Sequence, residues 1–198
     1  MRVFAFIAVL AVALPVHAAD GFAELGGGVM IPAADSTWTD YVDPSPKLFV
    51  RGGATQNGFG GMLSFDWTPV NVDATTWNFL DVSAYRFRIL ANAVAHIHAG
   101  NKLEASARFG IGIDIQHVTV RAAIGPLSSK TDDDDYGLAL EPAFGIWYDV
   151  GPVQLGGELA LPISFHSYNA NDNKVVLDDF TAFDVDLLLG VRVGGGHR

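Results

Sequence analysis

Ionisable residues recur at every second position within apolar segments of this 198-residue chain. Arg86 and Arg88 are one such pair, and Asp184 and Asp186 are another. Charges brought together out of water must form ion pairs, because a buried charge without a partner is very costly. A line of such groups is also what a polar ion path requires. The spacing therefore predicts either a buried ion-pair network or a narrow channel.

Two further groups have the residue types of a metal site. His96 and His98 lie on one face of a strand and could both ligate a metal, but no third ligand is evident at a matching depth. We therefore interpret them as a buried hydrogen-bonded pair. Two acidic and amide-rich runs offer the oxygen ligands that calcium prefers, without the spacing or turn glycine of a calcium loop. We interpret these runs as solvated loops and predict no metal and no cofactor: Asp132-Asp133-Asp134-Asp135, and Asn169, Asn171, Asp172 and Asn173.

A two-residue period defines the elements that must position these charges. Every second residue from Leu103 to Ile115 is apolar, and the residues between them include Glu104, Arg108 and Asp114. Successive side chains of a strand point to opposite faces, so this segment has one apolar and one polar face. Such a strand suits a barrel with lipid outside and polar residues inside.

The composition limits the classes of protein that the chain can be. Hydrophobic residues make up 49% and charged residues only 17%, which is apolar for a secreted soluble domain. The formal net charge is −10, whereas nucleic acid and anionic lipid need basic patches. The chain has no cysteine, so no disulfide can stabilise it. We expect no nucleic-acid partner, and a fold stabilised by complete backbone pairing in lipid.

The first 18 residues have the parts of a secretory signal peptide. Arg2 is the single charge at the start, and an apolar run follows as far as Pro15. A small-x-small signal ends at Ala18, so we expect cleavage between Ala18 and Ala19. The alternative is an uncleaved anchor, but the run is shorter than the roughly 20 residues of a spanning helix. The prediction is a signal peptide over 1–18 and a mature domain over 19–198.

Eight segments of the mature chain are predicted to be strands. Several reach the roughly 9–11 residues that a tilted strand needs to cross a bilayer. Pro142 and Pro162 fall within two of them, where each marks either a bulge or a wrong strand limit. The expected strands are Phe22–Ile31, Lys47–Ala54, Phe59–Trp67, Ser83–His98, Leu103–Val118, Leu138–Tyr148, Val153–Phe165 and Phe183–Val193.

The connections between these strands alternate in length. Gln56-Asn57-Gly58, Ala99-Gly100-Asn101 and Gly151-Pro152 have the residues of tight turns. The other connections, around 32–46, 69–82, 119–136 and 166–179, are long and polar. Short turns on one side and long loops on the other are typical of outer-membrane barrels, with the loops outside the cell.

This pattern resembles the small outer-membrane β-barrels of the OmpA, OmpX and opacity-protein type. The resemblance covers residues 19–198 and rests on the eight alternating segments, the signal peptide and the alternating connections. It implies an all-β fold, an eight-stranded antiparallel up-and-down transmembrane β-barrel. It also implies export to the outer membrane of a Gram-negative cell, with outer-membrane lipid around the barrel.

The charged residues then face the interior of the barrel, here called the lumen. Eight strands enclose a space just wide enough for side chains to fill, so we favour a salt-bridged plug over a conducting pore. The predicted lumen network is Glu24, Arg51, Asp66, Arg86, Arg88, Glu104, Arg108, Asp114, Glu141, Glu158, Asp184, Asp186 and Arg192, with His96 on the same inward face.

Catalysis is the remaining question, because some barrels of this size class are lipid A deacylases with a His and Ser pair. His166 and Ser167 are adjacent here, whereas those enzymes separate the pair by one residue. Adjacent residues of a strand face opposite sides and cannot cooperate while the strand continues. We therefore predict that the protein is not an enzyme and has no catalytic residue.

The sequence thus predicts a structural or surface-binding protein of the cell envelope, which binds an extracellular ligand or surface through its external loops. Three alternatives stay open. They are a narrow porin-like channel, a lipid A-modifying barrel enzyme and a soluble secreted lipocalin-like barrel.

Overall fold

The computed structural model describes residues 20–33, 39–40, 42–72, 80–124, 127–166 and 180–194. The predicted signal peptide and its cleavage site lie outside the described residues. In the described part of the chain, no helix is long and apolar enough to cross a membrane. The strands are β1 (Asp20–Ala33), β2 (Val42–Asp43), β3 (Ser45–Gln56), β4 (Phe59–Val72), β5 (Leu80–His98), β6 (Leu103–Ile124), β7 (Leu127–Asp149), β8 (Val153–Ala160), β9 (Ile163–His166) and β10 (Phe180–Gly194).

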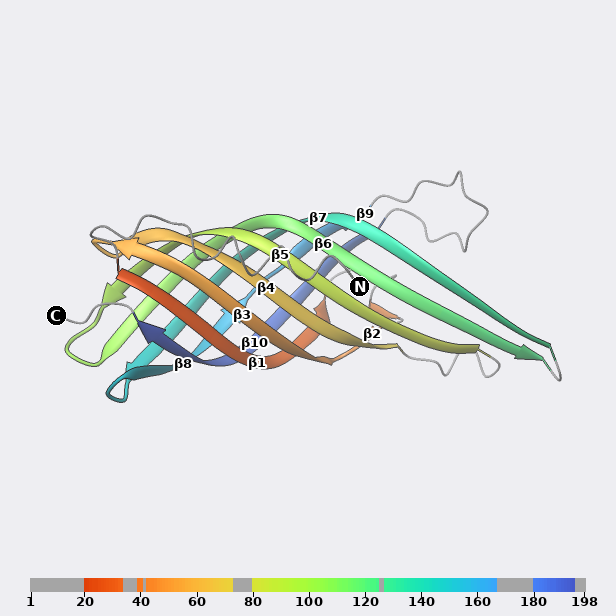
Figure 1. Ribbon diagram of the computed structural model, residues 1–198, viewed down its shortest axis with the longest axis horizontal. Helices are drawn as coiled ribbons and strands as arrows, with labels where there is room; N and C mark the ends of the chain where they lie inside the picture. Colours follow the sequence, from red (N-terminus) through yellow and green to blue (C-terminus); the bar gives the residue numbers. More distant parts are fainter. Residues whose placement is uncertain are drawn as a thin grey trace.

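The strands close into a barrel in which each pairs antiparallel with its neighbours (Figure 1). The ring is closed by β1 and β10, which pair from Phe22 opposite Gly194 to Ala33 opposite Phe183. Together β8 and β9 occupy one place between β7 and β10, and the short β2 pairs only with the end of β4. The ring therefore has eight strand positions, which confirms the predicted fold class.

The predicted strand Val153–Phe165 is interrupted between Ala160 and Ile163. Both Pro142 and Pro162 take part in the hydrogen bonds at this interruption. Between β8 and β9, Leu161 donates its N–H to the carbonyl of Pro142 on β7 at 2.9 Å. Pro162 has no N–H, but its carbonyl accepts from the N–H of Asp184 at 3.0 Å. Pro142 itself lies inside the continuous β7, opposite Phe109. Of the two prolines, only Pro162 coincides with a break in its own strand.

The tight turns lie where the sequence predicts them. Asn57 and Gly58 have φ angles of 55° and 80°, the pair of positive values that a two-residue hairpin turn requires. Gly100 and Gly151 also have positive φ, at 93° and 98°. These angles are accessible to glycine without the steric penalty of a Cβ atom.

The predicted loop over 119–136 is wrong, because this segment is a continuation of β6 and β7. The two strands stay paired to their tip, where Ile124 lies opposite Leu127. Here β7 carries polar residues on both faces, so the apolar alternation that identifies a membrane strand disappears from it although its pairing with β6 continues. Together with the end of β5, these strands extend well beyond the other strands (Figure 1). We call residues 80–85, 116–124 and 127–135 the projecting sheet.

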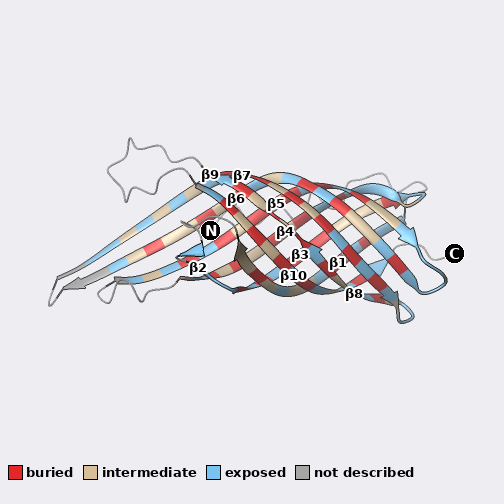
Figure 2. Cartoon of the chain, turned by 180° about the vertical axis from the view of Figure 1, so that it is seen from behind, coloured by how far each residue is buried: buried red, intermediate tan, exposed pale blue. Residues whose placement is uncertain are grey.

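Exposed and buried residues alternate along the barrel strands (Figure 2). The exposed positions are apolar: Ile111 and Ile113 are 51% and 52% exposed, and Leu189 is 73% exposed. On β6 this apolar face runs from Leu103 to Ile115 and gives way to His117. At about 3.4 Å per residue and a tilt of about 40°, that run spans roughly 30 Å, the thickness of a bilayer core.

We predict that Ile111→Arg lowers the free energy of unfolding in lipid vesicles by about 2–4 kcal/mol. Ile111 lies near the middle of the apolar face, where a charged side chain would meet hydrocarbon. Asn101→Arg, in an exposed turn, adds the same charge outside this face and should change stability little. The check is urea unfolding in vesicles, and a neutral Ile111→Arg would contradict the assignment of this face to lipid.

Candidate functional site

The lumen contains every residue of the predicted charge network. Each has a relative exposure of 9% or less, with Glu158 the most exposed and Asp114, Glu141, Asp184 and Asp186 at 0%. They come from β1, β3, β4, β5, β6, β7, β8 and β10, because each strand directs alternate side chains inward. The network can therefore connect strands that are far apart around the ring.

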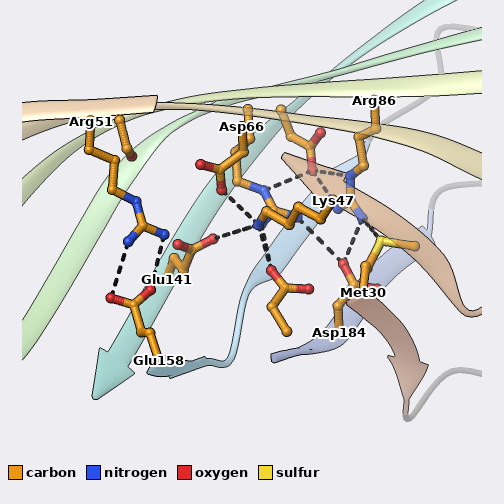
Figure 3. A network of polar contacts seen from close by, with 12 residues as sticks. Met30, Lys47, Arg51, Asp66, Arg86, Glu141, Glu158 and Asp184 are labelled. Atoms are coloured by element: carbon orange, nitrogen blue, oxygen red, sulfur yellow. Dashed lines mark hydrogen bonds and ion pairs between the residues drawn. The ribbon is translucent and has the colours of Figure 1, made fainter. Parts of the chain in front are cut away.

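The half of the network nearer the projecting sheet, the loop-side half, is centred on Lys47, Arg86 and Arg88. Lys47 contacts Asp66 at 2.6 Å and Asp186 at 2.5 Å (Figure 3). Arg86 donates to Asp114 and to Asp184, each at 2.6 Å. Since these partners lie on different strands, each cation fixes the relative positions of strands that are not neighbours.

Glu141 joins the two halves of the network. It accepts from Arg88 at 2.7 Å on the loop side and from Arg108 at 2.5 Å on the turn side. Arg108 in turn donates to Glu158 at 2.7 Å, and Arg51 faces the same carboxylate at 3.0 Å (Figure 3). The ion pairs are therefore continuous through the middle of the barrel.

The turn-side half ends at Arg192. This guanidinium donates to Glu24 at 2.8 Å and also contacts Glu104. It lies over the ring of Trp147, with 4.1 Å from Cζ to the centroid, which is a cation–π geometry. The indole N–H of Trp147 donates to Ser106 at 3.1 Å. The indole of Trp147, the largest buried side chain of the lumen, thus packs against Arg192.

Apolar clusters lie at both ends of the charged region. At the loop end, Met30, Val42, Val70, Ala84 and Ala182 form a buried cluster. At the turn end the cluster is Phe22, Met62 and Val94. Val42 belongs to the short β2, which was not predicted from the sequence. This strand places the Val42 side chain in the mouth of the barrel. A path along the lumen would have to cross these apolar clusters as well as the ion pairs.

Lys47 is the main residue of the lumen network that was not predicted from the sequence. It lies in the predicted strand Lys47–Ala54, and the alternation of Ser45, Lys47, Phe49 and Arg51 would have placed it inward. Its exposure is 2%, and it contacts three carboxylates of the network. Polar side chains that carry no charge also complete the lumen: Asn92, Gln116, Gln154 and Ser164.

The histidines do not form the arrangements that were considered for them. His96 and His98 both approach Glu104, at 3.5 Å and 3.3 Å. The prediction of a buried pair is wrong for His98, whose side chain is 51% exposed because it lies at the end of β5. His166 faces the lumen and lies 2.6 Å from Asp135, while Ser167 lies outside the described residues. In the described part of the chain, no group of three or more acidic, histidine or cysteine residues could hold a metal.

The acidic run is an ordered part of the projecting sheet. Thr119 and Lys130 donate to Asp132 at 2.7 Å and 2.8 Å, and these hydrogen bonds lower the pKa of that carboxyl. Asp134 lies 2.5 Å from Nδ1 of His117, whose ring stacks on Tyr85. The residues predicted at 169–173 lie outside the described residues. The run from Asp132 to Asp135 is therefore part of a paired strand, with contacts on both faces.

We predict that Glu158→Gln destabilises the barrel by about 3–5 kcal/mol, because it removes one of the two carboxylates that face each of two buried guanidinium groups. The partners are Arg51 and Arg108, so adding Arg51→Gln should recover part of the loss. That pair should show a coupling energy of about 0.5–3 kcal/mol. Arg86→Gln, whose partners are Asp114 and Asp184, is the control and should be additive with Glu158→Gln. Unfolding in lipid vesicles gives the values for the three single and two double variants. Additivity of Glu158→Gln with Arg51→Gln would contradict the observed pairing.

Comparison with known proteins places this fold. No protein-family profile matches the chain, and no curated protein sequence matches it. The structure is similar to Neisserial surface protein A, with a TM-score of 0.58, 11% identity, and coverage of 87% of this chain and 96% of that one. It is also similar to a major outer membrane protein from Thermus thermophilus, with a TM-score of 0.60, 13% identity, and coverage of 90% and 100%.

A third similar structure is Ail, the attachment invasion locus protein of Yersinia pestis, in complex with the heparin analogue sucrose octasulfate. Here the TM-score is 0.55 and the identity 12%, with coverage of 89% of this chain and 99% of that one. At these identities the likeness shows the fold alone. The chain has the fold of the small eight-stranded outer-membrane β-barrels, which confirms the resemblance seen in its sequence.

Proposed function

We propose that this protein is exported to the outer membrane of a Gram-negative cell and acts there as a closed, non-enzymatic anchor for an external binding surface. One observation carries the proposal. The lumen is filled by ion pairs between two apolar clusters, whereas β5, β6 and β7 continue far beyond the apolar face of the barrel. The projecting sheet is thus the part of the protein that is accessible to an external partner.

The lumen argues against a channel. Each of its arginines, and Lys47, has a carboxylate within 4.0 Å, so an entering ion would have to break ion pairs at the centre. It would also have to pass Met30 and Val42 at one end and Phe22 and Met62 at the other. A water-filled pore needs more strands than eight to leave free space inside.

The distribution of side chains argues against the other two alternatives. A soluble lipocalin-like barrel would carry its apolar side chains inside, whereas here they are outside and the charges are inside. A lipid A-modifying enzyme would need its reactive groups to meet lipid. His166 instead has a side chain that is 1% exposed and directed into the lumen, next to Asp135 and Asp114.

The charge of the projecting sheet indicates the chemistry of its partner. Its described residues include Asp81 and the run from Asp132 to Asp135, against Arg121 and Lys130. Both cations are within 4.0 Å of aspartates of the same sheet. Ail was solved with a polyanionic heparin analogue. The excess of acidic groups here favours a cationic partner and disfavours such a polyanion.

We predict that the purified protein produces no discrete conductance steps in planar bilayers at neutral pH. The physical reason is the filled lumen described above, in which each arginine and Lys47 has a carboxylate partner and a buried apolar cluster lies toward each end. Retention of the folded barrel is checked on the same sample by its heat-modifiable mobility on a gel. Reproducible steps from the folded wild-type protein would contradict a plug and favour the narrow channel.

We predict that cells carrying the protein adhere to surfaces coated with a cationic peptide and not to heparin-coated surfaces. Asp132→Asn, Asp133→Asn and Asp134→Asn combined should abolish this adhesion, since they remove three external carboxylates. Asp149→Asn, at the turn side, is the control and should adhere normally. Exposure is checked with Asp134→Cys, because the chain has no other cysteine to react with an impermeant maleimide. Equal adhesion of the triple variant, or no labelling on intact cells, would contradict the proposal.

A further inference from the structure

The lumen has more buried carboxylates than permanent cations. Among the described residues it holds eight buried carboxylates and six buried arginine or lysine side chains. Each half holds four carboxylates and three cations, so one of the two surplus carboxylates lies in the loop-side half. Buried charge has to be compensated, so a further proton is expected in that half. The carboxylates there are Asp66, Asp114, Asp184 and Asp186, and the cations are Lys47, Arg86 and Arg88.

His166 on β9 is placed to supply this charge. Its side chain is 1% exposed, and its two ring nitrogens face two different carboxylates. Nδ1 lies 2.6 Å from Oδ2 of Asp135 in the projecting sheet, and Nε2 lies 3.7 Å from Oδ2 of Asp114 in the lumen. The ring lies over Gly137, where a Cβ atom would be 2.8 Å from Cε1 of the histidine. The site therefore has room for the imidazole only because β7 has no side chain there.

Other groups from neighbouring strands contact the same carboxylate of Asp114. Asp114 on β6 also accepts from Arg86 on β5 and from Ser164 on β9. Arg88 lies 3.7 Å from the same carboxylate, and Arg86 continues to Asp184 on β10. Arg86, Arg88 and the His166 ring all contact the same oxygen, Oδ2 of Asp114. The two ring nitrogens face the carboxylates of Asp135 and Asp114.

We propose that His166 is a doubly protonated imidazolium that acts as a latch between the lumen network and the projecting sheet. A neutral imidazole has one N–H and can donate to one carboxylate only, whereas the imidazolium donates from both nitrogens. The latch ties Asp135 of the projecting sheet to Asp114 of the lumen. Loss of the proton removes the positive charge that both pairs with Asp114 at 3.7 Å and strengthens the 2.6 Å hydrogen bond to Asp135.

The latch makes the order of the projecting sheet depend on external pH. The latch is complete while both ring nitrogens carry a proton, and it is weakened when one of these protons leaves. Hydrogen bonds to charged groups contribute about 1.5–3 kcal/mol, so opening of the sheet should increase by about tenfold to a hundredfold. This goes beyond the proposed function, because it concerns the order of the sheet with no partner bound.

The test is made on the purified protein in phospholipid nanodiscs. Nitrogen-15 NMR of the histidine rings reports the charge of His166, and amide hydrogen exchange reports the opening of residues 127–135. We expect both ring nitrogens to be protonated at acidic pH, and the amide protection to fall by about tenfold or more between about pH 5 and pH 8 after correction for intrinsic exchange. His166→Gln should have the low protection at every pH.

Two variants make the result specific. His117→Gln removes a histidine that contacts Asp134 in the same sheet, and it should leave the dependence on pH intact. Asp135→Asn keeps all lumen charges and should remove the dependence on pH, which preserves the test if His166→Gln fails to fold. A neutral His166 ring throughout this pH range, or unchanged protection in Asp135→Asn, would overturn the latch and would leave the adhesion proposal standing.

Discussion

The compensation of buried charge is the constraint on which this barrel depends. An eight-stranded interior has room for side chains and little else, so charges that face inward have to find partners there. Arg108 meets Glu141 and Glu158, and Arg192 meets Glu24 and Glu104, across strands that are not all neighbours. A slip of one residue in any strand would turn its charges outward. The ion pairs therefore fix the register of the ring together with the backbone hydrogen bonds.

The outer face follows from the same alternation. Because inward positions are polar, the positions between them are free to be apolar, and Leu25, Ile111 and Leu189 are more than half exposed. In water such a continuous apolar surface would drive association, whereas lipid accepts it and leaves the closed backbone satisfied. The apolar clusters around Met30 and around Phe22 then cover the ends of the polar interior.

Beyond the apolar face the strands are stabilised by polar side-chain contacts and not by burial in lipid. At His117, Thr119 and Arg121 the outer face of β6 is polar, yet the strand stays paired with β7 to Ile124. Contacts such as Thr119 with Asp132 and His117 with Asp134 hold this sheet through side chains that suit water. His166 contacts both Asp135 of the projecting sheet and Asp114 of the lumen, so this one side chain connects the two parts.

The sequence by itself determined the strands, their faces and the tight turns, because alternation and turn residues are local properties. It placed Glu24, Arg86 and Glu158 on inward-facing positions without any knowledge of their neighbours. The tertiary structure decided what local patterns do not contain. Closure of β1 on β10 set the register of the ring. In this register Glu158 forms ion pairs with Arg51 and Arg108, and Arg86 pairs with other carboxylates. Pairing with β6 turned the acidic run from a predicted loop into a strand, since polar residues on both faces leave no periodic signal but still form a ladder.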